Sequence, residues 1–418
     1  MEERSEVELP GAPSDYARLT AAKWQRRSFD QWDEDSSAPG SMRRVQSEDF
    51  TSSVLTVFKD LVSGIGQASE VVEALEPTLS RCDALDFNDV GSTLAYLLWH
   101  QADRYHRVVE SLHTLFRLGV LPIARPGRSL RVLEVGSGPA PATYAATHYY
   151  HALGRWAGER DDGFTSSISV EASTIDRGSA WGPLVHRLSE TMMAAGNRAS
   201  AVNLFATTYD NLVGFDPMFL HTQERERVKN QLVEQEPLDL YFGDDVDYDA
   251  EAAAHAPPSA YDLIVVANFL TNSSMMDQLE ADLEVLARSL VPGGVLLTLS
   301  GTGPEYVGLW ERFKMLPSVR RLDHVANERV QPHSDVKTRR LISEGLLDGI
   351  RHLSAVSQVS FADLGLPPDV YRALEVTNAE DFVVSDGVWY PSFALHAFKR
   401  GNRAISPKEQ ARMAKRRR

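Results

Sequence analysis

The stretch LRVLEVGSGPAPATYAA, residues 130–146, carries more information on the fold than any other part of the chain. It begins with an apolar run that has the composition of a buried strand, and Glu134 stands near the end of that run. Gly136 and Gly138 follow, and a helical pattern comes after them. Glycine permits a tight strand-to-helix turn and lets a ligand approach the backbone closely. The stretch therefore predicts a ligand site at a turn that leaves a sheet.

The glycine spacing fits neither of two common phosphate-binding motifs. A dinucleotide fingerprint needs glycine or alanine three residues after Gly138, but Pro141 occupies that position. Pro139 and Pro141 also lack the amide hydrogen that would donate to a pyrophosphate. A Walker loop needs a Lys-Ser or Lys-Thr pair after the glycines, and none follows them. The turn therefore predicts a ligand that has no phosphate to bind there.

The rest of the chain beyond residue 126 alternates short β-rich segments with helical ones, which is typical of parallel strands joined by crossover helices. The expected strands are residues 130–135, 167–171, 261–267 and 294–300, with another inside 238–242. The secondary structure of residues 200–235 is not decided by the sequence, because a strand near 202–205 and an inserted helix around 223–234 both fit short apolar runs. We expect an α/β fold with a doubly wound, Rossmann-like sheet.

These motifs resemble those of the class I S-adenosylmethionine-dependent methyltransferases. The first motif of that family is an acid followed by Gly-x-Gly-x-Gly, and here it spans residues 134–140 with Ala140 in place of the third glycine. The likeness continues through most of residues 128–310, in Ile168-Ser-Val-Glu171, in Gly243-Asp244-Asp245 and in residues 260–268 and 290–300. The resemblance implies a methyltransferase sheet, S-adenosyl-L-methionine as the cofactor and methyl transfer as the activity.

The resemblance also implies which residues hold the cofactor. Glu171 corresponds to the acid that binds the ribose hydroxyls, and Asp244 or Asp245 to the acid beside the adenine. The distance from Gly136 to Glu171 exceeds the roughly 20 residues usual for such an acid, and the polar insert at residues 155–166 accounts for the excess. The implied cofactor-binding set is Glu134, Gly136, Ser137, Gly138, Ala140, Glu171, Asp244, Asp245 and Asn268.

The methyl acceptor stays open at this point. Asn268 is followed by Phe-Leu, whereas methyltransferases that act on base amines have Asn-Pro-Pro-aromatic there, so a base amine is not indicated. Methyl transfer depends mainly on placing the nucleophile in line, and a general base matters when the acceptor is a hydroxyl. His148, Tyr149 and His151 are candidate bases, and the sequence selects none of them. We expect a small molecule or a peptide as acceptor.

A more distant resemblance implies a different function. The methyltransferase-like proteins of small-ribosomal-subunit assembly combine an N-terminal helical region with a Gly-Ser-Gly-Pro turn and a Val-Glu-x-Ser segment, here residues 136–139 and 170–173. Their cysteine cluster is absent, because Cys82 is the single cysteine of the chain. This resemblance implies an assembly or RNA-associated protein with weak or no catalysis.

Four regions are expected along the chain: a disordered arm at residues 1–48, a helical subdomain at 50–125, a methyltransferase domain with insertions at 126–398, and a basic disordered tail at 399–418. An apolar stripe at 94–116 supports the helical subdomain, with Ser92 as its N-cap and Gly119 as a stop signal. Tyr96, Trp99 and Tyr105 are candidates to line a ligand cleft. Residues 385–387 have a turn sequence that would join two C-terminal strands in a hairpin.

The charge of the chain bears on its partners. The formal net charge is −15, and such a field opposes binding to a phosphate backbone unless positive charge is concentrated. Residues 399–418 concentrate it, with nine basic residues and one acid. A nucleic-acid contact or nuclear import through this tail stays open beside a merely solvated tail, and nucleic acid is not favoured.

Composition excludes several classes of protein. One cysteine cannot form an internal disulfide or a thiolate metal site, and the twelve histidines form no HExxH pattern, so we expect no metal. No run approaches the roughly 18 apolar residues of a membrane span, and the acidic first residues differ from a signal peptide. We expect a cytoplasmic protein.

Overall fold

The computed structural model describes residues 15–80, 85, 87–123, 129–160, 170–176, 180–194, 204–208, 261–267, 270–330, 336–368, 370–371 and 392–401. The α-helices in these ranges are α1 (Asp15–Ser37), α2 (Met42–Leu61), α3 (Ile65–Ser80), α4 (Val90–Leu118), α5 (Pro141–Glu159), α6 (Trp181–Ala194), α9 (Ser273–Arg288), α10 (Pro304–Met315) and α11 (Val336–Ser357). The strands are β1 (Leu130–Val135), β2 (Val170–Asp176), β3 (Leu204–Thr208), β4 (Tyr261–Ala267), β5 (Leu290–Ser300), β6 (Leu322–Val330) and β7 (Phe393–Arg400).

The strands form one seven-stranded sheet with the order β3-β2-β1-β4-β5-β7-β6. Strands β1 to β5 are parallel, and β7 runs antiparallel between β5 and β6. From β1 the chain builds the sheet outward through β2 and β3, and then returns to the other side of β1 to begin again at β4. The strand order therefore reverses between β1 and β4, where open α/β sheets bind their ligands. The doubly wound fold expected from the sequence is confirmed.

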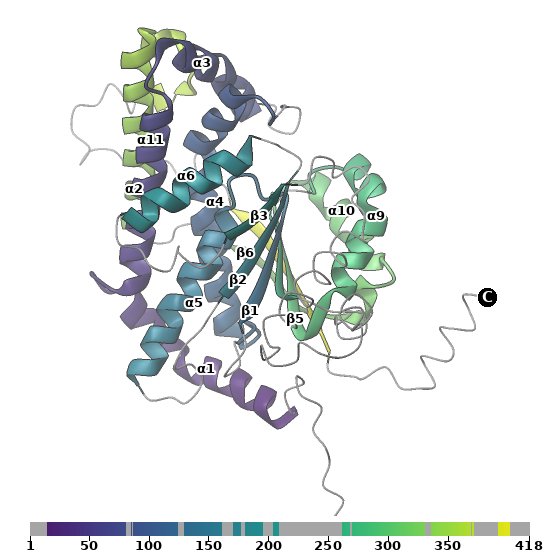
Figure 1. Ribbon diagram of the computed structural model, residues 1–418. Coiled ribbons are helices and arrows are strands. Elements are labelled where there is room, and N and C mark those ends of the chain that lie inside the picture. Colours follow the sequence, from purple (N-terminus) through teal and green to yellow (C-terminus); the bar gives the residue numbers. More distant parts are fainter. Residues whose placement is uncertain are drawn as a thin grey trace, which may run out of the picture.

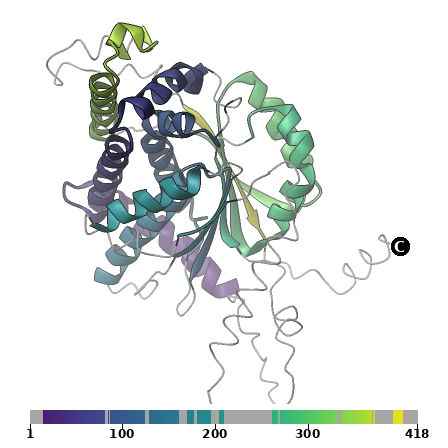
Figure 2. The same ribbon diagram turned by 45° about the horizontal axis from the view of Figure 1, so that its top comes forward.

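Helices cover both faces of this sheet (Figures 1 and 2). Helices α4, α5 and α6 lie on one face, and α9 and α10 lie on the other. Each face has its own apolar core: Val132 and Leu263 belong to the first, and Leu133 and Ile264 to the second. This alternation along each strand follows from the period of two in β structure. None of the described helices is long and apolar enough to cross a bilayer.

The expectation of a disordered arm at residues 1–48 is wrong for the described part of it. Residues 15–37 form α1, and α2 begins at Met42. Trp24 and Trp32 are 4% and 1% exposed in the core that α1 shares with α4 and α5. The Trp32 ring lies 5.3 Å from that of Trp156, and its Nε1 donates to Tyr149 Oη at 3.1 Å. Burial of these indole rings holds the helix in place although most of its residues are polar.

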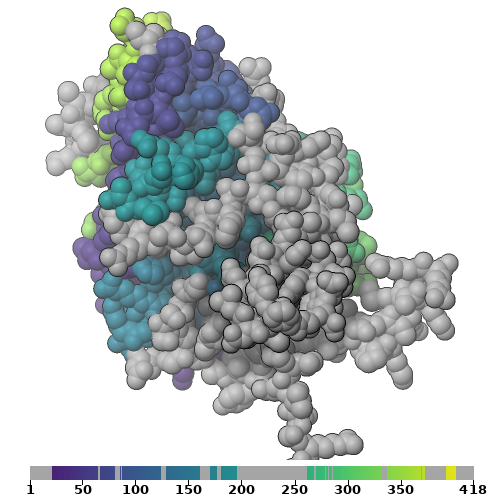
Figure 3. Space-filling view, in the orientation of Figure 1, coloured from purple at the N-terminus to yellow at the C-terminus, as the bar shows by residue number. Residues whose placement is uncertain are grey.

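The helical region at residues 50–125 is continuous with the sheet domain in its packing. Helix α4 lies directly against α5 beside the sheet, and both contribute to the same apolar core. Helix α4 begins after Asp89, whose side chain accepts from Ser92 N at 2.7 Å, so Asp89 and not Ser92 is the N-cap. Gly119 ends the helix at φ 73°, as expected. Helix α11, from the far end of the chain, packs against α2 and α3 (Figure 3).

The strand boundaries show what the sequence located correctly. Strands β1 and β4 have the expected limits, and β5 begins four residues earlier than expected. Strand β2 spans residues 170–176, where 167–171 was expected. The third strand of the sheet is β3, close to the alternative at 202–205, and residues 238–242 lie outside the described residues. Both edges of β7 are occupied, by β5 and β6, and the turn at 385–387 lies outside the described residues.

The basic tail begins later than expected. Lys399 and Arg400 belong to β7 and pair with β5 or β6. Arg400 Nη1 donates to the carbonyl oxygen of Arg288 at 3.0 Å and also to that of Leu290. Residues 402–418 lie outside the described residues.

Candidate functional site

The glycine turn follows β1 at the carboxyl edge of the sheet, at the reversal of strand order. Gly136 has φ 65° and Gly138 has φ 50°, which is left-handed backbone that glycine adopts without strain. Ala140 also has a positive φ, 60°, and is the N-cap of α5. An L-residue pays about 1 kcal/mol or more for this conformation. The turn therefore places an alanine in a backbone conformation that favours glycine.

Every amide hydrogen of the turn and of the first residues of α5 already has an acceptor. Pro139 and Pro141 have no amide hydrogen. The remaining donors and acceptors are Gly136 N and Ser137 N to Ile175 O (2.9 and 3.1 Å), Gly138 N to Asp176 Oδ2 (2.7 Å), Ala140 N to Ser137 O (2.9 Å), Ala142 N and Thr143 N to Glu134 (3.0 and 2.8 Å), and Tyr144 N to Ala140 O (3.2 Å). The turn thus offers no backbone donor for a phosphate group.

Glu134 holds the start of α5 rather than facing a ligand. Its side chain is buried, and its two carboxylate oxygens accept from the amides of Ala142 and Thr143. These amides stand at the positive end of the helix, where a carboxylate is stabilised. Burial raises the pKa of Glu134 to about 7, and the two backbone hydrogen bonds partly oppose that rise. The expected cofactor contact of Glu134 is therefore replaced by a positioning role.

The expected ribose-binding role of Glu171 is contradicted by strand register. Glu171 pairs with Arg131, near the amino ends of β1 and β2. The glycine turn leaves the opposite, carboxyl end of β1, which is about 15 Å away at the rise of a strand. Strand β2 continues five residues past Glu171 and ends in Asp176, whose carboxylate bonds to Gly138 N. Asp176 is therefore the acid that lies beside the turn.

Two aromatic side chains from different helices lie over the turn. A Cβ atom built on Gly138 would lie 3.7 Å from the Tyr96 ring and 3.8 Å from the Trp181 ring. The two rings contact each other edge to face, with centroids 5.4 Å apart. Tyr96, which was expected to line a ligand cleft, lies over the turn and is not among the residues that line the cavity described below. Tyr105 stacks on Phe50 at 4.0 Å in the core between α2 and α4, so its expected role in the cleft is wrong.

Buried polar atoms beside the turn are left without partners. Gln101 Nε2 donates to Pro139 O at 2.9 Å, but Gln101 Oε1 has no hydrogen-bond donor among the described residues. The Trp181 Nε1 atom is likewise buried, with no acceptor in the described part of the chain. Buried polar groups are nearly always paired, so an unpaired donor and acceptor at one turn are typical of a site that a ligand completes.

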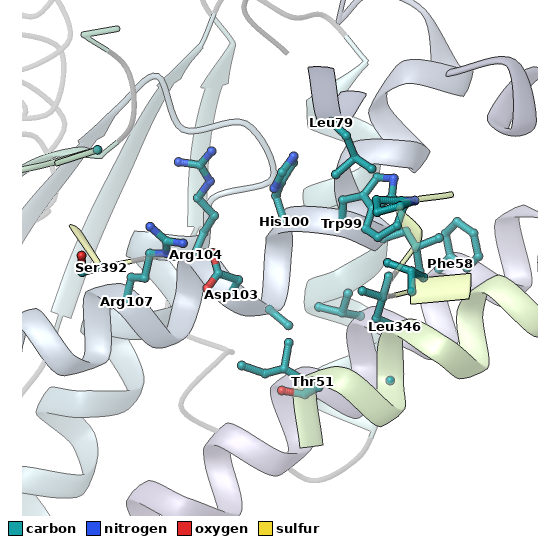
Figure 4. A pocket seen from close by; sticks show the side chains of 18 of the residues that line it. Thr51, Phe58, Leu79, Trp99, His100, Asp103, Arg104, Arg107, Leu346 and Ser392 are labelled. Carbon is teal, nitrogen blue, oxygen red and sulfur yellow. Dashed lines mark hydrogen bonds and ion pairs between the residues drawn. The ribbon is translucent and has the colours of Figure 1, made fainter. Parts of the chain in front are cut away.

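A cavity of about 550 Å³ lies next to the carboxyl end of β5. It is formed by side chains of α2, α4 and α11 together with residues 301–303 that follow β5 (Figure 4). Strand β5 is two strands away from β1 in the sheet, which is about 10 Å at the usual strand spacing. Trp99, expected to line a cleft, lines this cavity. The glycine turn and the cavity are therefore neighbours along one edge of the sheet.

His100 lines the cavity, and no pattern in the sequence pointed to a function for it. It lies on α4, and its ring centroid is 4.9 Å from that of Tyr96. Burial, followed by the positive charge of Arg104, lowers the pKa of His100 to about 3. The imidazole is therefore neutral at pH 7 and only weakly basic. His100 is therefore better suited to form a hydrogen bond with a bound methyl acceptor than to remove a proton from that molecule.

The three expected bases on α5 are engaged elsewhere. His148 Nδ1 lies 2.9 Å from Tyr105 Oη, and Gln46 Nε2 lies 2.9 Å from His151 Nδ1. Tyr149 Oη accepts from Trp32 of α1. None of the three lines the cavity, because the face of α5 that carries them packs against α1, α2 and α4. Their interpretation as catalytic bases is not supported.

The remaining sequence-derived residues lie outside the described part of the chain. These are Asp244, Asp245 and Asn268. Ser137 is described, and its amide and carbonyl groups are used within the turn. Among the described residues, no group of three or more His, Cys, Asp or Glu side chains could hold a metal ion.

The chain was compared with known proteins. No protein-family profile matches it, and no curated protein sequence matches it. A solved structure from Galdieria sulphuraria, assigned as a sarcosine dimethylglycine methyltransferase, is 13% identical with a TM-score of 0.34 and covers 71% of this chain and 86% of its own. The Haemonchus contortus phosphoethanolamine N-methyltransferase 2 is 12% identical with a TM-score of 0.32, covering 77% of this chain and 61% of its own.

A third solved structure, the N-methyltransferase NodS from Bradyrhizobium japonicum, is 12% identical with a TM-score of 0.29 and covers 79% of this chain and 98% of its own. These likenesses are remote, and we assign the fold from strand order and direction. A sheet of order β3-β2-β1-β4-β5-β7-β6, in which β7 runs antiparallel to both neighbours, is a doubly wound, Rossmann-like sheet. The fold expected from the sequence is confirmed.

Proposed function

We propose that this protein is a methyltransferase that binds S-adenosyl-L-methionine over the turn at residues 136–140. The observation that carries the proposal is the complete use of the turn's amide hydrogens within the protein. A dinucleotide would need some of these donors for its pyrophosphate, whereas S-adenosylmethionine has no phosphate. The cofactor carries the methyl group on a sulfonium sulfur. When the methyl group is transferred, the rest of the cofactor leaves as a neutral thioether.

The residues around the turn fit such a ligand. The carboxylate of Asp176 lies beside the turn through its bond to Gly138 N, and a carboxylate can accept several hydrogen bonds, including those of a ribose diol. The rings of Tyr96 and Trp181 give an apolar surface above the glycines. Gln101 Oε1 and Trp181 Nε1 add an acceptor and a donor that have no partner among the described residues. These groups bind and orient, and no step of proton transfer is assigned to them.

The cavity beside β5 supports the second half of the proposal, binding of the methyl acceptor. It opens on the same edge of the sheet as the turn, so an acceptor held there and a cofactor held over Gly138 would lie side by side. Catalysis then consists mainly of holding the nucleophile in line with the methyl group and excluding water. The size of the cavity, about 550 Å³, suits a small molecule or the side chain of a peptide.

Calorimetric titration of the full chain tests the cofactor. S-adenosylmethionine and S-adenosylhomocysteine should bind in the micromolar range, and NAD should not bind. The variant Gly136→Val should abolish the binding while the chain stays folded by circular dichroism, because a β-branched residue resists φ 65° and blocks close approach. Tight NAD binding, or normal cofactor binding by the folded variant, would contradict the proposal.

A further inference from the structure

The cavity beside β5 is divided into a charged end and an apolar end. Figure 4 shows Asp103, Arg104, Arg107 and Ser392 gathered on one side. On the other side lie Phe58, Leu79, Trp99 and Leu346. A cavity with this division fits an occupant that is itself divided into an apolar body and a charged group.

The two arginines at the charged end differ in their partners. Arg107 Nε donates to Asp103 Oδ2 at 2.7 Å, and both side chains are buried. This pair is internally neutral. Arg104 forms no ion pair with any described residue, and its Nε and Nη1 atoms are buried without a hydrogen-bond acceptor in the described part of the chain. Its Cζ lies 5.9 Å from the centroid of the Tyr96 ring, and its positive charge acts on His100.

The two buried nitrogens of the Arg104 guanidinium have no acceptor among the described residues, and such donors are costly unless a ligand completes them. Buried donors are almost always paired, and leaving a charged one unpaired costs more than leaving a neutral one. The guanidinium presents a planar fork of donors that matches the two oxygens of a carboxylate. Glu305, the remaining acid among the described residues that line the cavity, is exposed and forms no ion pair with Arg104.

The position of Arg104 relates it to the glycine turn as well. Tyr96, His100 and Arg104 are spaced by four residues, so they lie on one face of α4. Tyr96 contacts the turn at Gly138, and Arg104 reaches the cavity. A group held by Arg104 would therefore lie along the same face of α4 as the ring that lies over the turn.

We propose that the methyl acceptor is a small molecule with an apolar body and a carboxylate, and that the carboxylate pairs with Arg104. This inference rests on the proposed function, because it names the acceptor class of the same site. The apolar body lies among Phe58, Leu79, Trp99 and Leu346, and the ion pair fixes the orientation of the molecule. Methyl acceptors without a negative charge leave the guanidinium unpaired and are excluded by that cost.

Matched ligand pairs test the charge requirement. The full chain, saturated with S-adenosylhomocysteine, is titrated with octanoate, 3-phenylpropanoate and indole-3-acetate, and with the uncharged amide of each acid. At least one acid should bind about 10-fold or more tightly than its amide, as expected for hydrogen bonds to a charged group. Equal affinities for acid and amide in all three pairs would overturn the inference.

Variants locate the effect at Arg104. Arg104→Met keeps much of the volume and removes the charge, so it should abolish the preference for the acid, whereas Arg104→Lys should retain part of it. Arg351→Met is the matched control, because Arg351 is exposed on α11 and does not line the cavity. If Arg104→Met keeps the preference of the original chain, the inference is wrong.

A last comparison tests whether Arg104 binds the carboxylate of the methyl acceptor or the carboxylate of the cofactor. S-adenosylhomocysteine has an amino-acid carboxylate, and 5′-methylthioadenosine lacks it. If Arg104→Met weakens binding of the first ligand and not of the second, Arg104 serves the cofactor and the inference is overturned. Failure of the proposed function gives a different result, because S-adenosylhomocysteine then does not bind at all. That result is independent of how the carboxylic acids bind when S-adenosylhomocysteine is absent.

Discussion

The carboxylate of Asp176 accepts a hydrogen bond of 2.7 Å from the backbone amide of Gly138. This bond joins the last residue of β2 to the glycine turn that follows β1, at the point where the strand order reverses. A carboxylate with further acceptor capacity is thereby fixed beside the site where a cofactor would lie.

Asp176 should therefore dominate ribose recognition. Asp176→Ala should weaken binding of S-adenosylhomocysteine by about 10- to 150-fold, because hydrogen bonds to a charged group contribute roughly 1.5–3 kcal/mol. Glu171→Ala is the control and should leave the affinity unchanged, since Glu171 lies near the amino end of the same strand. Calorimetric titration measures both, and a reversed order of effects would return the role to Glu171.

Glu134 should act through stability. Glu134→Gln leaves one acceptor oxygen where two amides need acceptors, and its amide group would face the N–H of Ala142 or Thr143. We expect a loss of about 1–3 kcal/mol in the free energy of unfolding, the usual cost of an unsatisfied buried group. Urea denaturation measures it. Unchanged stability together with lost cofactor affinity would show that Glu134 contacts the ligand after all.

Helix α1 should be needed for a stable fold. Trp32→Ala removes a ring that is 1% exposed and packs against Trp156 and Tyr149. The expected loss is about 3–5 kcal/mol, as for other buried tryptophans. Met315→Ala, at a side chain that is 62% exposed, should change stability by less than about 0.5 kcal/mol. Equal and small effects of both substitutions in thermal denaturation would favour a disordered arm.

Stability should fall as the solution is acidified from pH 6.5 toward pH 5. Burial lowers the pKa values of His100 and His148 to about 3 and that of His396 to about 4, so only the unfolded chain binds protons on them in this window. The raised pKa of Glu134, about 7, acts in the opposite sense, because the folded chain binds that proton. Three histidines against one carboxyl leave the unfolded chain with between one and two more protons near pH 5.5, or about 1–2 kcal/mol per pH unit.

Denaturation midpoints across a pH series check this sign. His148→Gln should flatten the dependence, because one of the neutral buried histidines is lost. His186→Gln changes an exposed histidine that pairs with Glu190 on its own helix, and it should leave the slope unaltered. Stability that rises on acidification over this window would mean that Glu134 outweighs the histidines.

The sequence located the centre of the sheet because its strands are short, apolar and bounded by turns. Leu130–Val135 and Tyr261–Ala267 have the expected limits for that reason. Strand β2 was placed too early, since Ile168 to Glu171 has a strand-like pattern that ends in an acid, whereas the actual strand continues through Ser173 and Thr174 to Asp176. Only the register with β1 shows which acid reaches the turn.

Other parts of the fold, and the cavity, depend on contacts between distant segments that no local sequence pattern encodes. Helix α1 was missed because charged residues surround its two buried tryptophans. Strand β6 was missed because its residues are largely polar, as suits an edge strand. The cavity joins residues of α2, α4 and α11 with a segment after β5, and Arg104 becomes distinctive only when its neighbours are known.

Helix α4 presents Gln101 to the glycine turn and Arg104, three residues later, to the cavity. Residues of one continuous helix therefore contribute to both sites. If ligand binding at one site shifts α4, the free energy of binding at the other site changes. Thermodynamic linkage makes this coupling equal in both directions. The helix therefore provides a physical route to cooperative binding, by which an enzyme commits to its second ligand only once the first is in place.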